Sequence, residues 1–177
     1  MMASSDWQSR CGIRKIVQAD SYGCGVACLA MVAGITYEEA RQRFNSLGLG
    51  VRRGCKPAYS TSSGEMRMAI SSSGLITDSR RWRGWAELQG LAVIKVRDDW
   101  RGAKGRWHWA VAFRHPEFDI AVFDPHQTEP SFSRMPSDVL CFDFRIYEPK
   151  GEWFQIEQLF PLCVGPSPKQ DAGQMEP

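Results

Sequence analysis

The stretch QADSYGCGVACLAMVAG, residues 18–34, governs how the rest of this sequence is interpreted. Residues 24–32 are almost all small or apolar and Gly34 follows them, a pattern typical of a short buried helix that ends at a glycine. Cys24 lies in the first turn of this predicted helix, between Gly23 and Gly25. The unpaired N–H groups and the dipole of a helix N-terminus stabilise a thiolate, so we expect a lowered pKa for Cys24. The same residues also fit a purely structural alternative, in which Cys24 and Cys28 are two small buried side chains on one helix face.

Length and composition describe one ordinary globular domain. The chain has 177 residues with 22 basic and 20 acidic side chains, so net charge imposes no class of partner. Its six cysteines include no C-x2-C pair, which argues against a zinc site and favours reduced thiols in a cytoplasmic protein. We find no apolar run long enough to span a membrane and no cleavable signal peptide, although export by a machine that needs no such signal stays open.

Periodicity predicts helices first and strands second, an α+β fold. Two capping boxes, Thr36 with Glu39 and Ser62 with Glu65, should start helices that end before Gly48 and Gly74. Residues 1–12 are expected to form a flexible arm, residues 13–164 the domain, and residues 165–177 a disordered tail. The strand-like runs are residues 91–96, 107–113, 120–123, 139–147 and 152–160.

A cysteine nucleophile needs a base, and the base needs a group that orients it. If residues 115–118 form a four-residue turn between two antiparallel strands, continuing the register brings His108 opposite Pro125. Asp124 then lies within one residue of the position opposite His108, and a bulge or a one-residue register shift would bring the two side chains together. His108 is therefore the histidine for which local geometry supplies a carboxylate.

The other positions around His108 set further expectations. His108, Ala110 and Ala112 share one strand face, whose small side chains leave room for a neighbouring helix end. His115 lies in the predicted turn and is interpreted as a solvated loop residue. His126 follows the second strand and is kept as a second-choice base.

Three short motifs resemble those of the papain-like cysteine peptidases that remove double-glycine leaders from bacteriocins, best known as the N-terminal peptidase domains of bacteriocin ABC exporters. The family's first motif has a glutamine, a cysteine six residues later, then Gly-x-Ala and an apolar helix. The second is a histidine followed by an aromatic and small apolar residues, and the third is an Asp-Pro that closes the next strand. The matching residues are Gln18, Cys24, Gly25 and Ala27, then His108 to Val111, then Asp124 and Pro125, within residues 13–160.

The resemblance implies a papain-like fold and a Cys-His-Asp triad. Cys24 would be the nucleophile, His108 the general base and acid, and Asp124 its orienting group. Gln18 would donate its side-chain amide, with the Cys24 backbone N–H, to the oxyanion. The implied partner is a peptide or protein substrate; neither a nucleic acid partner, a metal nor an organic cofactor is expected. The sequence departs from the family at Gly23, where an acidic residue or Asn is common, and no transporter segments follow, so we expect a stand-alone domain.

Alternatives stay open at this level. The same machinery could act on a side-chain amide, as a glutamine deamidase, a transglutaminase-like enzyme or a cell-wall amidase. Such an activity would suit an effector toxin with a bacterial secretion machine or an immunity protein as partner. A non-catalytic peptide-binding module and a metal site of Cys24, Cys28 and His108 are further readings, the latter with poor zinc spacing. Residues 80–85, RRWRGW, favour a solvated turn over a site for an acidic peptide or nucleic acid.

Overall fold

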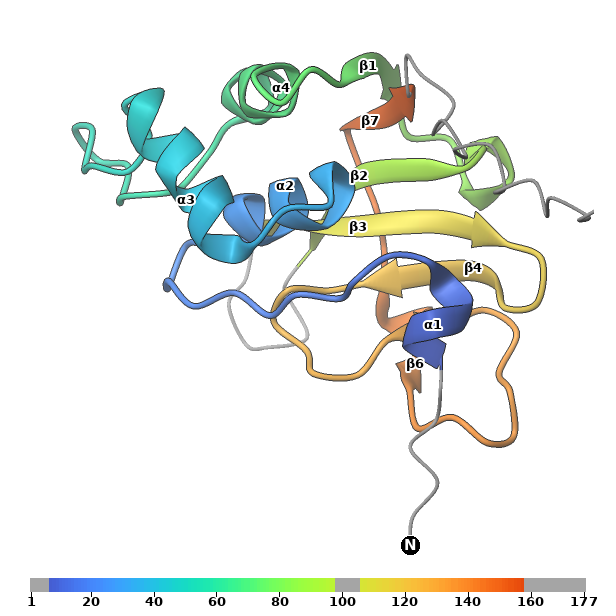
Figure 1. Ribbon diagram of the computed structural model, residues 1–177. Coiled ribbons are helices and arrows are strands. Elements are labelled where there is room, and N and C mark those ends of the chain that lie inside the picture. Colours follow the sequence, from blue (N-terminus) through green and yellow to red (C-terminus); the bar gives the residue numbers. More distant parts are fainter. Residues whose placement is uncertain (1–6, 98–105, 158–177) are drawn as a thin grey trace, which may run out of the picture.

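The computed structural model describes residues 7–97 and 106–157. It is an α+β fold, as the sequence predicts, with helices from the first half of the chain packed on one face of a seven-stranded sheet (Figure 1). The predicted tail at residues 165–177 lies outside the described residues. The helices are α1 (Trp7–Cys11), α2 (Cys24–Ala33), α3 (Tyr37–Ser46) and α4 (Ser63–Ser71).

The three helices predicted from the sequence begin and end close to their expected positions. α2 starts at Cys24 and is followed by Gly34, whose φ of 65° is left-handed and stops the helix. Both predicted capping boxes are present, at the starts of α3 and α4. Every residue of α2 from position 25 to position 32 is buried, so α2 is the central helix of the domain.

The sheet has the strand order β1-β7-β2-β3-β4-β5-β6, and only the β5–β6 pair is parallel. Four of the predicted strands are present, namely β2, β3, β4 and β7. The fifth predicted strand, residues 139–147, forms only the short β6 and the 3-10 turn η3 (Phe144–Ile146). β1 and β5 were not predicted. The strands are β1 (Ile76–Arg81), β2 (Leu91–Arg97), β3 (Trp107–His115), β4 (Asp119–Phe123), β5 (Ser131–Phe132), β6 (Phe142–Asp143) and β7 (Glu152–Glu157).

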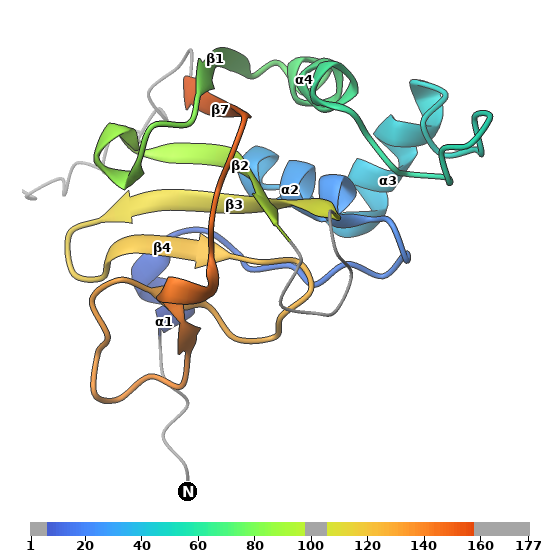
Figure 2. The ribbon, with the colours of Figure 1, turned by 180° about the vertical axis from the view of Figure 1, so that it is seen from behind.

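Two apolar clusters lie on opposite faces of the sheet. The helices pack on the bulky face of β3, formed by Trp109, Val111 and Phe113, and not on the small face as the sequence suggested. That expectation was wrong because large side chains fill the gap between the sheet and the helices. On the other face, turned toward the viewer in Figure 2, Ala110 and Ala112 leave space that tryptophans fill instead.

Two residues of the 80–85 stretch, Trp82 and Trp85, pack against this second cluster, so the stretch is not simply a solvated turn. Arg80 and Arg81 lie in β1, and the indole of Trp82 packs edge-on against that of Trp153, with ring centroids 5.8 Å apart. Trp85 packs against Trp82 in the same way at 4.8 Å. The indoles therefore face the sheet, where they cover apolar surface.

Part of the N-terminal arm is also ordered. Residues 7–11 form α1, and the buried ring of Trp7 lies 5.5 Å from that of Phe123 and 6.5 Å from that of Phe132. The sequence predicted a flexible arm over residues 1–12. Residues 7–11 differ from that prediction because the buried ring of Trp7 packs against other aromatic rings, although the neighbouring residues are polar. Across the described ranges, no helix has the length and apolar character needed to cross a membrane.

Candidate active site

The hairpin of β3 and β4 brings His108 and Asp124 together. His115 pairs with Asp119, so the turn has three residues, 116–118, and not the four that the sequence suggested. Asp119 has a positive φ of 59° at this tighter turn. The resulting one-residue shift places Asp124 diagonally across from His108 on the same face, and His108 Nε2 lies 3.1 Å from Asp124 Oδ1.

Burial and hydrogen bonding fix the roles of this pair. His108 is 5% exposed and Asp124 is fully buried. An ionised carboxylate only accepts, so with Asp124 in that form Nε2 is the donor and Nδ1 is the basic nitrogen of the ring. Asp124 Oδ1 also accepts from the backbone N–H of His126 at 2.8 Å, and Oδ2 accepts from the Tyr147 hydroxyl at 3.1 Å. The carboxylate is thus held on both oxygens.

His126 lies beside this pair. Its ring centroid is 4.8 Å from that of His108, and the side chain is exposed. The position fits the strand register, which places His126 opposite His108 when it is continued past the last paired residues of β3 and β4. The carboxylate of Asp124 lies against His108, and His126 contributes its backbone N–H to the same oxygen.

Cys24 lies at the N-terminus of α2, against the strand that carries His108. The backbone N–H groups of Trp109 and Gly25 act on the Cys24 thiol in the direction that favours a thiolate. Burial raises the pKa of Cys24 to about 11, because the cost of desolvating a thiolate exceeds what these N–H groups recover, and the charge of Asp124 raises it further. The sequence predicted a lowered pKa, so the direction was wrong: desolvation outweighs the helix terminus.

The glycines beside Cys24 make room for side chains from α3 and from the segment before α4. A Cβ at Gly23 would lie 2.1 Å from the Tyr37 hydroxyl, and one at Gly25 would lie 2.9 Å from Thr61 Oγ1. Thr61 Oγ1 in turn accepts a hydrogen bond from the Trp109 indole at 3.0 Å. A larger residue at Gly23, the position that departs from the resembled family, would displace the Tyr37 hydroxyl from where it lies.

Gln18 connects the loop before Cys24 with the loop that carries Asp124. Its backbone N–H donates to the carbonyl oxygen of Pro125 at 2.9 Å. Its side-chain amide donates to the carbonyl oxygens of Asp20 at 2.8 Å and Ser21 at 3.2 Å. The amide is thus placed within the loop that leads into α2.

Sequence reasoning missed two residues that contact Asp124, Tyr147 and Lys15. Lys15 Nζ donates to the backbone carbonyl of Asp124 at 2.9 Å and to that of Gln127. Burial lowers the pKa of Lys15 to about 8, although the nearby Asp124 and Glu129 raise it. Neither residue belongs to a motif, and each is far from Asp124 in sequence, so no local signal could have found them.

His115 is structural, and the prediction of a solvated loop residue was wrong. Its ring stacks on Phe118 with centroids 4.7 Å apart, and its Nε2 contacts the carbonyl oxygen of Arg10 at 2.9 Å. Its Nδ1 accepts from the backbone N–H groups of Glu117 and Phe118. These contacts order the β3–β4 turn and tie it to α1.

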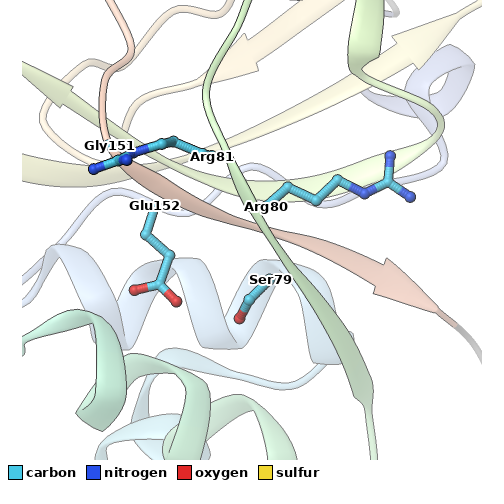
Figure 3. Close-up of a pocket in the computed structure, with 5 residues that line it drawn as sticks. All are labelled: Ser79, Arg80, Arg81, Gly151 and Glu152. Carbon is cyan, nitrogen blue, oxygen red and sulfur yellow. The ribbon is translucent and has the colours of Figure 1, made fainter.

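A separate shallow pocket of about 290 Å³ lies where β1 meets the start of β7 (Figure 3). The side chains of Arg80 and Arg81 point in opposite directions there, and Glu152 also lines the pocket. Arg80 is already paired with Asp78 at 2.7 Å. This mixed charge does not favour an acidic ligand. Within residues 7–97 and 106–157, no three His, Cys, Asp or Glu side chains are grouped to hold a metal ion.

The arrangement of helices and sheet is the papain-like fold, in the form seen in double-glycine peptidase domains. A crystal structure of a double-glycine motif protease from an AMS/PCAT transporter, in complex with the leader peptide, is similar with a TM-score of 0.53 and 18% identity. The match covers 81% of this chain and 90% of that one.

The peptidase domain of Streptococcus ComA, a bi-functional ABC transporter involved in a quorum sensing pathway, is also similar. Its TM-score is 0.54 at 18% identity, over 81% of this chain and 96% of that one. No protein-family model matches the sequence, and no curated protein matches it. At this identity the likeness establishes the fold.

Proposed function

We propose that this chain is a cysteine peptidase, with Cys24 as nucleophile, His108 as general base and acid, and Asp124 as the group that orients His108. The observation that carries the proposal is the buried hydrogen bond between His108 and Asp124, on a strand whose next residue, Trp109, belongs to the buried cluster against which Cys24 packs. The fold shared with peptidase domains supports the same reading. A base oriented by a carboxylate next to a thiol is the arrangement that nucleophilic catalysis needs.

The chemistry begins with transfer of the Cys24 proton to Nδ1 of His108. The thiolate then attacks the carbonyl carbon of the scissile amide, and the carbonyl electron pair moves onto oxygen. When the tetrahedral intermediate collapses, the C–N bond breaks and His108 gives its proton to the leaving amine. Water, deprotonated by His108, then attacks the acyl-thioenzyme, which releases the carboxylic acid and returns the proton to Cys24.

The raised pKa of Cys24 makes the partner histidine essential. With a pKa of about 11, the half-buried thiol supplies almost no free thiolate near neutral pH. Transfer of the proton to His108 creates an ion pair inside the site, and the charge on Asp124 stabilises the imidazolium. Nucleophile and base are thus activated together.

Stabilisation of the oxyanion is assigned to the backbone N–H of Cys24 and the side-chain amide of Gln18. The amide hydrogen-bonds to the carbonyls of Asp20 and Ser21, so in this proposal it turns toward the substrate when the oxyanion forms. Each such donor contributes on the order of 100-fold to 1000-fold in rate. The α2 N-terminus has no side-chain cap, which leaves its first N–H groups available for this role.

The proposed substrate is a peptide, since one structural neighbour was crystallised with a leader peptide. The test incubates the purified chain with synthetic double-glycine leader peptides and follows cleavage by mass spectrometry. We expect cleavage by the native chain and a loss of at least about 1000-fold in Cys24→Ala and His108→Ala. Cys55→Ser is the matched control, because Cys55 is an exposed free cysteine.

Equal activity of Cys24→Ala and Cys55→Ser would contradict the proposal. A different product would redirect it: a mass gain of about 1 Da without chain cleavage marks hydrolysis of a side-chain amide. Intact protein mass spectrometry of the native chain during turnover should also show an acyl adduct on Cys24. That adduct should be missing in Cys24→Ala and retained in Cys55→Ser.

A further inference from the structure

Tyr147 belongs to no motif, yet its hydroxyl contacts the carboxylate of the candidate triad. It lies directly after η3, 23 residues beyond Asp124, and its hydroxyl donates to Asp124 Oδ2 at 3.1 Å. The side chain is 4% exposed, and its ring packs in the apolar cluster on the face of the sheet away from the helices. The hydroxyl therefore meets the carboxylate in a dry environment, where a hydrogen bond to a charge is strong.

The bond restricts Asp124 in two ways. Oδ1 receives His108 Nε2 and the His126 N–H, so a donor on Oδ2 opposes rotation of the carboxylate away from the histidine. A donor to the charged form also favours ionisation of a carboxyl that is fully buried. An ionised Asp124 accepts a charge-assisted hydrogen bond from the imidazole, whereas a protonated one carries no charge and holds the ring more weakly.

We propose that Tyr147 is a positioning residue for the triad: its hydroxyl holds Asp124 ionised and keeps Oδ1 directed at His108. The inference rests on the proposed function for its catalytic consequence, but the coupling between Tyr147 and Asp124 can be measured without a substrate. Titratable groups on several elements face or influence Asp124, and the test must separate them from Tyr147. They are His108, His126, Lys15, Cys24 and Cys28.

The test compares Tyr147→Phe with a matched variant, Tyr59→Phe. Tyr59 is also buried, and its hydroxyl donates at 3.2 Å to the neutral side chain of Asn45, away from the triad. Both changes remove one buried hydroxyl and keep the ring. The readouts are the titration of Asp124 by carboxyl carbon NMR and the pH profile of kcat/KM for peptide cleavage.

In Tyr147→Phe we expect the Asp124 titration midpoint and the acidic limb of the profile to move up by about one pH unit, with kcat about 10-fold lower at neutral pH. Tyr59→Phe should leave both unchanged. An Asp124 titration that does not move in Tyr147→Phe overturns the proposal, whatever happens to the rate. A shifted titration in a chain that cleaves no peptide or amide supports the coupling and overturns the proposed function instead.

Discussion

At the scale of single residues, Lys15 supports the loop that carries Asp124. Its amine donates to two backbone carbonyls, those of Asp124 and Gln127. Burial lowers the pKa of Lys15 from 10.5 to about 8, so above pH 8 the folded protein holds the neutral amine. A neutral amine still has two N–H bonds, which is enough for both carbonyls. The two hydrogen bonds from Lys15 to this loop therefore do not require a charged amine.

This pKa predicts how stability depends on pH. Between about pH 8 and pH 10.5 the unfolded chain binds the Lys15 proton and the folded chain does not, so the stability contribution of Lys15 rises with pH in that window. In Lys15→Met we expect this rise to vanish. Urea unfolding of both proteins at pH 7, 8, 9 and 10 should show a stability difference that grows above pH 8, by at most about 1.4 kcal/mol per pH unit. A difference that stays constant with pH would contradict the assignment.

The sequence predicted the residues with a motif and missed those without one. Cys24, His108 and Asp124 were identified from a helix start, a strand and an Asp-Pro, and the structure brings His108 and Asp124 into contact. Lys15 and Tyr147 reach Asp124 only through tertiary packing, which leaves no periodic trace in the chain. The pKa of Cys24 could not be predicted for a related reason, because desolvation depends on what covers the thiol.

At the scale of elements, the start of α4 carries the most strongly bonded cap of the domain's described helices. The carboxylate of Glu65 accepts from the Ser62 backbone N–H at 2.7 Å, from the Ser62 hydroxyl at 2.9 Å and from Lys56 at 3.0 Å. Partial burial raises the pKa of Glu65, but these bonds outweigh it and lower the pKa to about 2. The cap is thus a stabilising element whose strength depends on ionisation.

Glu65→Gln should therefore destabilise the protein in a pH-dependent way. The stabilisation is fully present above about pH 4.5 and is lost as the pH falls toward 2, so we expect a loss of about 1 kcal/mol at pH 7 that disappears near pH 2. Thermal unfolding across this range measures it. Glu39→Gln in the exposed capping box of α3 is the control, with a smaller effect expected because no lysine pairs with Glu39 in the described structure.

Helices were easier to predict than strands in this chain. Capping boxes and a terminal glycine are local signals, and they fixed the starts of α3 and α4. The missed β1 is rich in charged residues, and β5 is only two residues long. The predicted β3–β4 turn was one residue too long. His115 is held in place by contacts with Arg10 and Phe118, and the local sequence does not indicate these contacts.

At the scale of the whole molecule, the sheet is the layer shared by both apolar clusters. Phe154 lies in β7, is fully buried, and its ring lies 5.8 Å from that of Trp109 on the helix side. We expect Phe154→Ala to reduce the free energy of unfolding by about 3–5 kcal/mol, measured by urea denaturation. Leu140→Ala is the comparison, since Leu140 is 75% exposed, and a change within about 0.5 kcal/mol is expected there. Equal effects would place Phe154 outside the cooperative core.

The insertion of β7 between β1 and β2 has a consequence for the timing of assembly. Residues 152–157 pair with β1 on one side and β2 on the other, and these two strands lie some 60 to 75 positions earlier in the chain. Among the described strands, β1 pairs only with β7. All of the candidate site residues are synthesised before β7, namely Gln18, Cys24, His108, Asp124 and Tyr147. We therefore expect the nascent chain to carry all of these residues before its sheet is complete, so that the site reaches its final geometry only when β7 has paired with β1 and β2.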